Sequence, residues 1–178
     1  MVADAGEGLD RLGRDPIELV RPVPETQCQP SSHLEVERPV GLFDYVTDPS
    51  RFSEWQNGVV EGHMENEGPP SVGDKCSATR RIGFADRVVT SHVTHVDPPH
   101  SWGVRGIDGP IRAAVDVTVE PLENDRRSRV TITIDFTGYG IGKLLVPLLV
   151  RPQARREMPA NARRLKERLE TIDHPTSG

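Results

Sequence analysis

Residues 34–56 read LEVERPVGLFDYVTDPSRFSEWQ, and the order of elements in this stretch decides the fold. Leu34 and Val36 alternate with charged residues, which is typical of a strand with one buried face. After Arg38-Pro39, the apolar residues at positions 40, 43 and 46 have helical spacing. Asp48-Pro49 ends this helix and starts a second short helical turn that runs to Trp55. The stretch therefore predicts one strand followed by two short helices.

Downstream of this stretch the sequence favours strands separated by turn residues. We expect strands over 59–65, 75–82, 87–96 and 102–107, and two further strands that carry apolar residues at alternate positions over 111–119 and 130–136. Asp108-Gly109 is a strong hairpin signal between two of them. Strict alternation indicates one buried and one solvated face, which is typical of an antiparallel sheet.

After Gly138-Tyr139-Gly140 the hydrophobic period becomes helical. Residues 141–149 are mostly apolar, and Pro147 and Pro152 predict kinks or a helix in two pieces. The second piece carries a stripe at spacings of three and four, formed by Met158, Ala162, Leu165 and Leu169. A curved sheet with one apolar face needs a cover, and this helix is the only element long enough.

This order of elements resembles the START-related helix-grip superfamily (SRPBCC) over residues 32–170. Within it, the chain is most similar to the polyketide cyclase/dehydrase and lipid-transport group. The resemblance implies an α+β fold: a curved antiparallel sheet of about seven strands wrapped around a long C-terminal helix, with two short helices after the first strand. It also implies an internal cavity that holds a hydrophobic or polyketide-type small molecule, with no cofactor and no metal.

The ends of the chain differ in composition from this domain. Residues 1–32 are rich in glycine, proline and charge and contain no aromatic residue, so we expect a poorly ordered or loosely docked extension. The ligand-binding domain then spans 33–172, with a tail over 173–178. Deletion of residues 1–30 is expected to leave a folded domain.

The bulk composition excludes several classes of protein. A net charge of −5 and a pI near 5.7 argue against a nucleic-acid binder. No window is apolar enough for stable membrane insertion, and the N-terminus lacks the pattern of a secretory signal. Cys28 and Cys76 are expected to be free thiols in a reducing cytoplasm. The sequence leaves monomer and homodimer both open.

Standard catalytic motifs are absent, so candidate polar residues come from the strands and the closing helix. His92 and His95 are three apart on one strand and point to opposite faces unless a bulge intervenes. Each is a packed or surface histidine, a general acid–base group or, as the least favoured alternative, a metal ligand, since the pKa of histidine lies near neutrality. Arg80 and Arg81 occupy alternate faces, and Arg80 or Asn161 could polarise a substrate carbonyl unless these side chains face solvent.

The remaining candidates are ligand-binding residues. Trp55 and Trp102 either close the core or offer a flat apolar wall to a ring-shaped ligand. The predicted ligand-binding set comprises Tyr45, Trp55, Trp102, Arg105, Val115, Val117, Ile132, Ile134, Met158 and Leu165.

Two functions fit these observations. The first is a cofactor-independent cyclase, aromatase or dehydratase, a lyase of a biosynthetic pathway. The second is a binding or transport protein for a hydrophobic ligand. Ionisable groups that converge on the cavity would favour the enzyme, and an apolar lining would favour the carrier. A third interpretation, an interaction module, would require the helix to pack flush against the sheet.

Overall fold

The computed structural model describes residues 31–37, 41–82, 84–123 and 126–173. In the opening stretch it contains β1 (Ser31–Glu37), α1 (Leu42–Thr47), the 3-10 turn η1 (Pro49–Arg51) and α2 (Phe52–Trp55). The strand and two short helices predicted for residues 34–56 are therefore confirmed. The Asp48 carboxylate caps the second turn, because its Oδ1 accepts hydrogen bonds from the Ser50 backbone N–H at 2.9 Å and from the Ser50 hydroxyl at 2.7 Å.

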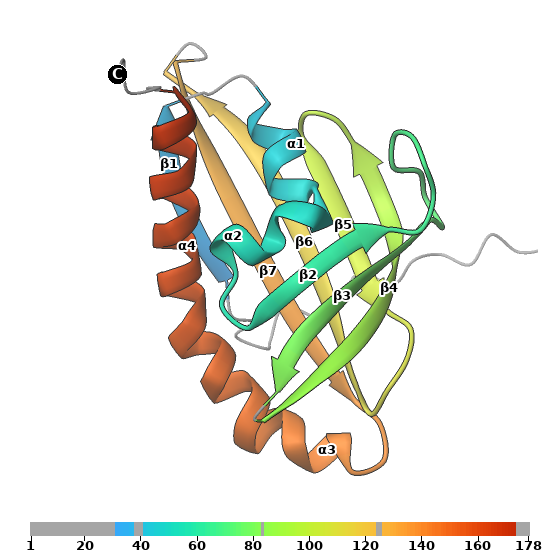
Figure 1. Cartoon of the computed structure of the whole chain (residues 1–178). Helices are drawn as coiled ribbons and strands as arrows, with labels where there is room; N and C mark the ends of the chain where they lie inside the picture. The colour runs from blue at the N-terminus through green and yellow to red at the C-terminus, as the bar shows by residue number, and fades with distance from the viewer. Residues whose placement is uncertain (1–30, 38–40, 83, 124–125, 174–178) are drawn as a thin grey trace, which may run out of the picture.

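The rest of the chain forms a single curled sheet closed by one long helix. The strands are β2 (Val59–Met64), β3 (Lys75–Ile82), β4 (Ala85–Asp97), β5 (Ser101–Gly106), β6 (Ile111–Leu122) and β7 (Arg127–Gly138). All seven strands pair antiparallel in the order β1-β7-β6-β5-β4-β3-β2, as Figure 1 shows. This arrangement confirms the predicted helix-grip fold.

The closing helix runs without a break through three differently wound parts. These are α3 (Gly142–Leu145), the π-helical turn η2 (Val146–Val150) and α4 (Arg151–Asp173). Pro147 lies in the π turn, where the wider winding accommodates a residue that cannot donate a backbone hydrogen bond. Pro159 lies inside α4. The prolines curve the helix around the sheet rather than splitting it (Figure 1).

The predicted stripe of α4 is the buried face of the helix. Met158, Ala162, Leu165 and Leu169 are buried, as are Val117 and Ile132 on the facing strands, whereas Val115 and Ile134 are half-buried. All of these residues except Met158 belong to or pack against one core with Trp55, Trp102 and the apolar face of α1. The predicted sheet-to-helix core is therefore confirmed. The first part of the helix behaves differently, because Ile141, Leu144, Leu148 and Leu149 are exposed to solvent.

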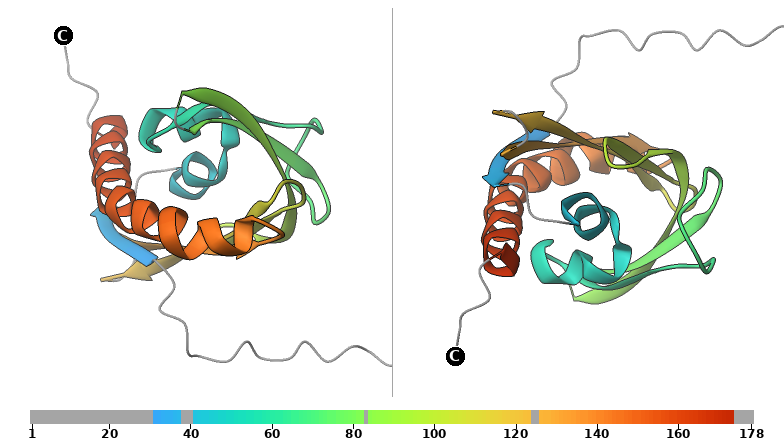
Figure 2. Two further views of the ribbon diagram at one scale, coloured as in Figure 1. Left: turned by 90° about the horizontal axis from the view of Figure 1, so that it is seen from below. Right: turned by 90° about the horizontal axis from the view of Figure 1, so that it is seen from above.

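The two short helices close one end of the curled sheet. Seen from below, α1 lies behind the opening that the sheet and the long helix enclose (Figure 2, left). Seen from above, α1 and α2 lie in front, over the end of the curled sheet that faces the viewer (Figure 2, right). The extension 1–30, Cys28 and the tail from residue 174 lie outside the described residues. Within the described residues, no helix is long and apolar enough to cross a membrane.

Candidate functional site

A cavity of about 320 Å³ lies between the concave face of the sheet and the closing helix. Its wall is mostly apolar, with side chains from α1, α2, α4 and six strands, which are all but β2. Four of the predicted ligand-binding residues from the sheet, Val115, Val117, Ile132 and Ile134, line it together with Trp55, Trp102 and Met158. A volume of this size is in the range that small-molecule sites occupy.

The alternation of β3 decides which arginine enters the cavity. Cys76, Ala78 and Arg80 share one face of this strand, and all three line the cavity. The Arg81 side chain instead makes a bidentate ion pair with Asp86 across the β3–β4 hairpin, at 2.8 and 3.0 Å. Arg81 also lines the cavity, at its exposed edge, but its guanidinium is held by Asp86, so Arg80 is the arginine that we expect a ligand to contact.

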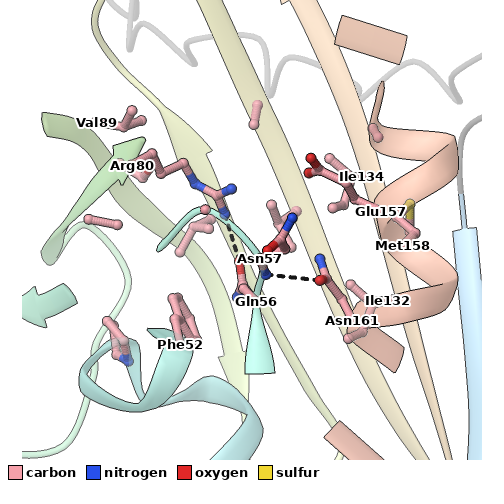
Figure 3. A pocket seen from close by; sticks show the side chains of 18 of the residues that line it. Phe52, Gln56, Asn57, Arg80, Val89, Ile132, Ile134, Glu157, Met158 and Asn161 are labelled. Atoms are coloured by element: carbon pink, nitrogen blue, oxygen red, sulfur yellow. Dashed lines mark hydrogen bonds between the residues drawn. The ribbon is translucent and has the colours of Figure 1, made fainter. Parts of the chain in front are cut away.

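Arg80 is held in place by a single strong contact. Its Nη2 donates to the Gln56 Oε1 at 2.6 Å, from the residue directly after α2, as Figure 3 shows. Burial lowers the pKa of the guanidinium, and the negative charge of Glu157 partly offsets this effect. Arginine remains protonated even so, which leaves a desolvated cation inside an apolar wall. Such a cation gains most from a ligand oxygen that carries negative charge.

The closing helix contributes the facing polar groups. Glu157 and Asn161 are one turn apart on α4, and both line the cavity (Figure 3). The Glu157 Oε1 accepts a hydrogen bond from the Gln153 Nε2 at 2.9 Å, which orients the carboxylate from the preceding turn. Glu157 and Arg80 thus place opposite charges on facing walls.

Asn161 has a positioning role that the sequence did not predict. Its Oδ1 accepts a hydrogen bond from the backbone N–H of Asn57 at 2.9 Å, which ties α4 to the turn between α2 and β2 (Figure 3). Since a backbone N–H only donates, this contact fixes the amide orientation and leaves its NH₂ group as a donor at the wall. A ligand oxygen near this NH₂ group could therefore accept a hydrogen bond from it.

The two tryptophans form part of the cavity wall. Both rings are buried, and Phe52 packs edge-on against each of them, at 5.8 Å from Trp55 and 6.2 Å from Trp102 between ring centroids. Both indole N–H groups are buried without a hydrogen-bond partner among the described residues. The rings thus serve as rigid apolar wall, which is one of the two roles predicted for them.

Neither histidine candidate lines the cavity. Val89 and Ser91 of β4 line it and Val93 is buried, so His92 points to the outer face of the sheet. The pairing with β5 then shifts between Val93 and His95, which is a β-bulge. The extra residue turns His95 to the outer face as well.

The outer environment of His95 confirms its orientation. The ring lies directly over Gly103, so closely that a Cβ at this glycine would collide with it, and Nδ1 is 3.8 Å from the Asp116 carboxylate. A bulge was the one feature that could bring both histidines to the same face, and it brings them to the solvated face. Neither histidine therefore takes part in the cavity site.

Three other candidates lie away from the lining. Arg105 is exposed and pairs with His92 in the sheet register, on the outer face. Tyr45 is buried in α1, where its hydroxyl donates to Glu54 at 2.9 Å, and burial raises its pKa to about 12. Leu165 is fully buried in the core beside the cavity.

Two polar residues of the site escaped the sequence prediction. Gln56 ends the opening stretch and carries no sequence signal beyond its polarity, and Glu157 lies next to the buried Met158. One available signal was that Glu157 lies one turn before Asn161, which was itself a candidate. Among the described residues, no group of three or more histidine, cysteine or acidic side chains could hold a metal ion.

Residues that line the cavity and are also exposed mark its mouth. They are Asn57 after α2, Arg81 and Ile82 at the end of β3, and Gln153 on α4. Arg80 and Glu157 adjoin these residues, whereas Trp102, Val117 and Ile132 are buried deeper in the molecule. The polar groups therefore lie toward the mouth and the apolar wall lies toward the closed end.

Solved structures with this architecture include aromatase/cyclase proteins. The Zhui aromatase/cyclase from Streptomyces sp. R1128 has a TM-score of 0.62 at 15% identity, over 83% of this chain and 96% of that one. The di-domain ARO/CYC BexL from the BE-7585A biosynthetic pathway gives 0.63 at 13%, over 82% and 47% of the two chains. A START superfamily protein from Mycobacterium smegmatis gives 0.57 at 15%, over 80% and 97%.

At these identities the structural likeness establishes the fold alone. No curated protein matches this sequence. The family assignment comes from the sequence, since the family model described as polyketide cyclase / dehydrase and lipid transport matches residues 37–170. This match runs from the last residue of β1 to the end of the buried helix stripe, and the chain therefore belongs to the polyketide cyclase/dehydrase and lipid transport family.

Proposed function

We propose that this protein binds a hydrophobic, polyketide-type small molecule in its cavity and acts on it as a cyclase or dehydratase. The observation that carries the proposal is that Arg80 and Glu157, two ionisable groups of opposite charge, line the same mostly apolar cavity. A carrier of apolar ligands has no need of a desolvated arginine, because burial of a cation is costly and an apolar ligand offers no charge to offset it. We also propose that the protein is located in the cytoplasm. The buried thiol of Cys76 supports this location, because it forms no disulfide and the cytoplasm keeps thiols reduced.

The chemistry assigned to Arg80 is stabilisation of negative charge. A β-ketone loses an α-proton to give an enolate, which then attacks a second carbonyl to close a ring. A fixed guanidinium at the carbonyl oxygen favours the enolate more than the ketone, because the charge on that oxygen grows as the proton leaves. Gln56 keeps the guanidinium oriented through its hydrogen bond at 2.6 Å.

The chemistry assigned to Glu157 is proton transfer. The carboxylate takes the α-proton and can return a proton to the hydroxyl that leaves as water in a dehydration. Gln153 orients the carboxylate through its hydrogen bond at 2.9 Å. The apolar walls contribute by folding a flexible chain so that its reacting carbons lie close together.

The test separates binding from turnover. The assays are the binding of an uncharged fluorescent naphthalene probe, which cannot form an ion pair with Arg80, and the ring closure of a soluble poly-β-ketone ester. The variants are Arg80→Gln and Glu157→Gln, with Arg87→Gln as a matched control, since Arg87 is an exposed arginine of the next strand. We expect Arg80→Gln and Glu157→Gln to keep probe binding within about threefold and to lose about 10²-fold or more in turnover. Thermal melts would confirm that each variant is folded.

Three outcomes would decide between the alternatives. Turnover that is unchanged in Arg80→Gln would remove this residue from the mechanism. Loss of turnover in His92→Ala or His95→Ala would contradict the placement of these residues on the outer face. The second candidate function, ligand transport, would stand if the parent protein bound the probe but closed no ring on any such ester, and the largely apolar lining favours this alternative.

A further inference from the structure

A ridge of exposed apolar side chains borders the mouth of the cavity. On one side are Ile82 and Phe84 at the β3–β4 hairpin, and on the other are Ile141, Leu144, Leu148 and Leu149 of the segment that includes α3 and η2. We call these six residues the apolar rim. The two sides lie at the same end of the molecule, across the opening from one another (Figure 1; Figure 2, left).

The first part of the closing helix turns its apolar stripe outward. Ile141, Leu144 and Leu148 follow the spacing of one helix face, and all three are exposed, whereas Val146 on another face is buried. A helix that only closes the sheet would place its polar face in water. Phe84 is 109% exposed, so its ring projects fully from the hairpin. Exposed apolar side chains that gather at one end of a protein are typical of interaction surfaces.

The charge around the rim identifies the partner. Residues 139–156 contain four basic residues, Lys143, Arg151, Arg155 and Arg156, and no acidic residue, in a chain of net charge −5. Asp135 of β7 forms an ion pair with Arg151 at 3.5 Å, and Glu157, which directly follows the segment, lines the cavity. The exposed Lys143 and Arg156 are therefore the charges that keep the segment positive. Leucines beside basic residues on a helix are the pattern of segments that lie in the interface of anionic bilayers.

The same charges argue against a second copy of the chain as the occupant. A two-fold dimer through this surface would bring each segment 139–156 against its own equivalent. Like charges would then face each other at close range, which is unfavourable. The apolar rim also surrounds an opening and projects outward, so a flat partner would leave its side chains unpacked, whereas a lipid surface deforms around them.

We propose that the apolar rim docks onto the surface of an anionic lipid bilayer, with the mouth of the cavity against the membrane. The rim side chains enter the headgroup region, and the basic residues of segment 139–156 lie near the lipid phosphates. A hydrophobic ligand then passes between the bilayer and the cavity without crossing water. The proposal concerns reversible surface binding, and it rests on the proposed function only in that a cavity ligand gives the docking a purpose.

The experiment measures co-flotation of the full chain with vesicles. Vesicles of phosphatidylcholine alone are compared with vesicles that also contain phosphatidylglycerol, at low and at high ionic strength. We expect binding to the anionic vesicles that weakens as salt is added, since salt screens the basic residues. The double variant Leu144→Ser/Leu148→Ser and the single variant Phe84→Ser should each bind at least about tenfold more weakly, because they remove the inserted apolar surface.

The matched control is Val72→Ser. Val72 is also an exposed apolar residue, 66% exposed, but it lies in the β2–β3 loop away from the mouth. Its vesicle binding should equal that of the parent. A charge variant, Lys143→Glu/Arg156→Glu, should lose the preference for anionic vesicles.

Several results would overturn the proposal. They are no binding to anionic vesicles at low salt, equal binding by the parent and the rim variants, or a rim-dependent dimer that ignores vesicles. Binding of the fluorescent probe without vesicles reports separately on the cavity, because Leu144, Leu148 and Phe84 do not line it. If the protein binds the probe but not the vesicles, the docking proposal fails and the proposed function stands. If it binds the vesicles but not the probe, the proposed function fails and the docking proposal stands.

Discussion

Replacement of Leu165 by alanine tests whether the fold is held together where the sheet meets the closing helix. Leu165 is 0% exposed and belongs to the core shared by the sheet and α4. The substitution removes three carbon atoms, worth about 2.4 kcal/mol at about 0.8 kcal/mol per buried carbon. The vacated space adds a further cost, because the strands and the helix cannot fully collapse into it. We therefore expect Leu165→Ala to lower the free energy of unfolding by about 3–4 kcal/mol.

The assay is equilibrium unfolding in urea followed by circular dichroism, with Leu144→Ala as the matched control. Leu144 is the same residue type in the same closing helix, but it is 67% exposed, so its substitution should change stability by less than about 0.5 kcal/mol. For a chain of this length, the loss at Leu165 corresponds to a fall in Tm of roughly 10 °C. A loss below about 1 kcal/mol at Leu165, or equal losses at both leucines, would show that α4 does not seal the core as described.

Two further predictions concern the cavity wall and the start of the closing helix. Burial raises the pKa of the Cys76 thiol to about 11, so in a Cys28→Ser background iodoacetamide should modify it at pH 8 at least about 10²-fold more slowly in the folded protein than in urea. The rate should climb with pH toward 11, and equal rates in the folded and unfolded protein would contradict the burial. Gly142→Ala would drive a Cβ into the Pro110 carbonyl oxygen, which is backbone and cannot rotate away, so we expect a loss of at least about 1–3 kcal/mol. A Cβ at Gly106 would come no closer than 3.3 Å to its nearest neighbour, the Ala113 backbone nitrogen, so Gly106→Ala should lose less stability. If Gly106→Ala lost more stability than Gly142→Ala in urea unfolding, the close packing of α3 on the β5–β6 loop would be refuted.

The architecture was predictable because each element carries a local signal. The sequence pattern predicts directly which faces are buried. Two examples are the alternation at Val115 and Val117 and the helical stripe at Leu165 and Leu169. The site was less predictable, because which strand face a polar residue occupies depends on register. Arg80 follows the alternation of its strand, but the bulge between Val93 and His95 leaves no mark in the sequence that distinguishes it from regular pairing.

The exposed part of the closing helix was equally hidden. Residues 141–149 are apolar apart from Lys143 and two conformationally special residues, Gly142 and Pro147, so their pattern does not say which face meets the sheet. In the structure the strands do not run along the whole of this segment. Only a few residues of the segment pack against the rest of the protein, among them the buried Val146. Apolar composition alone therefore could not separate core from interaction surface.

The positions of the polar groups and the apolar rim together constrain how a ligand enters. Arg80 and Glu157 adjoin the mouth, and the buried wall of Trp102, Val117 and Ile132 lies beyond them. An amphiphilic chain can occupy this cavity favourably in only one direction, with its apolar part deep and its oxygenated part beside Arg80, since the reverse would bury oxygen atoms against an apolar wall. If the mouth rests on a bilayer, a molecule that leaves the membrane apolar part first arrives in this same orientation. Its carbonyl groups then stop at the arginine and the carboxylate, where ring closure or dehydration is proposed to occur.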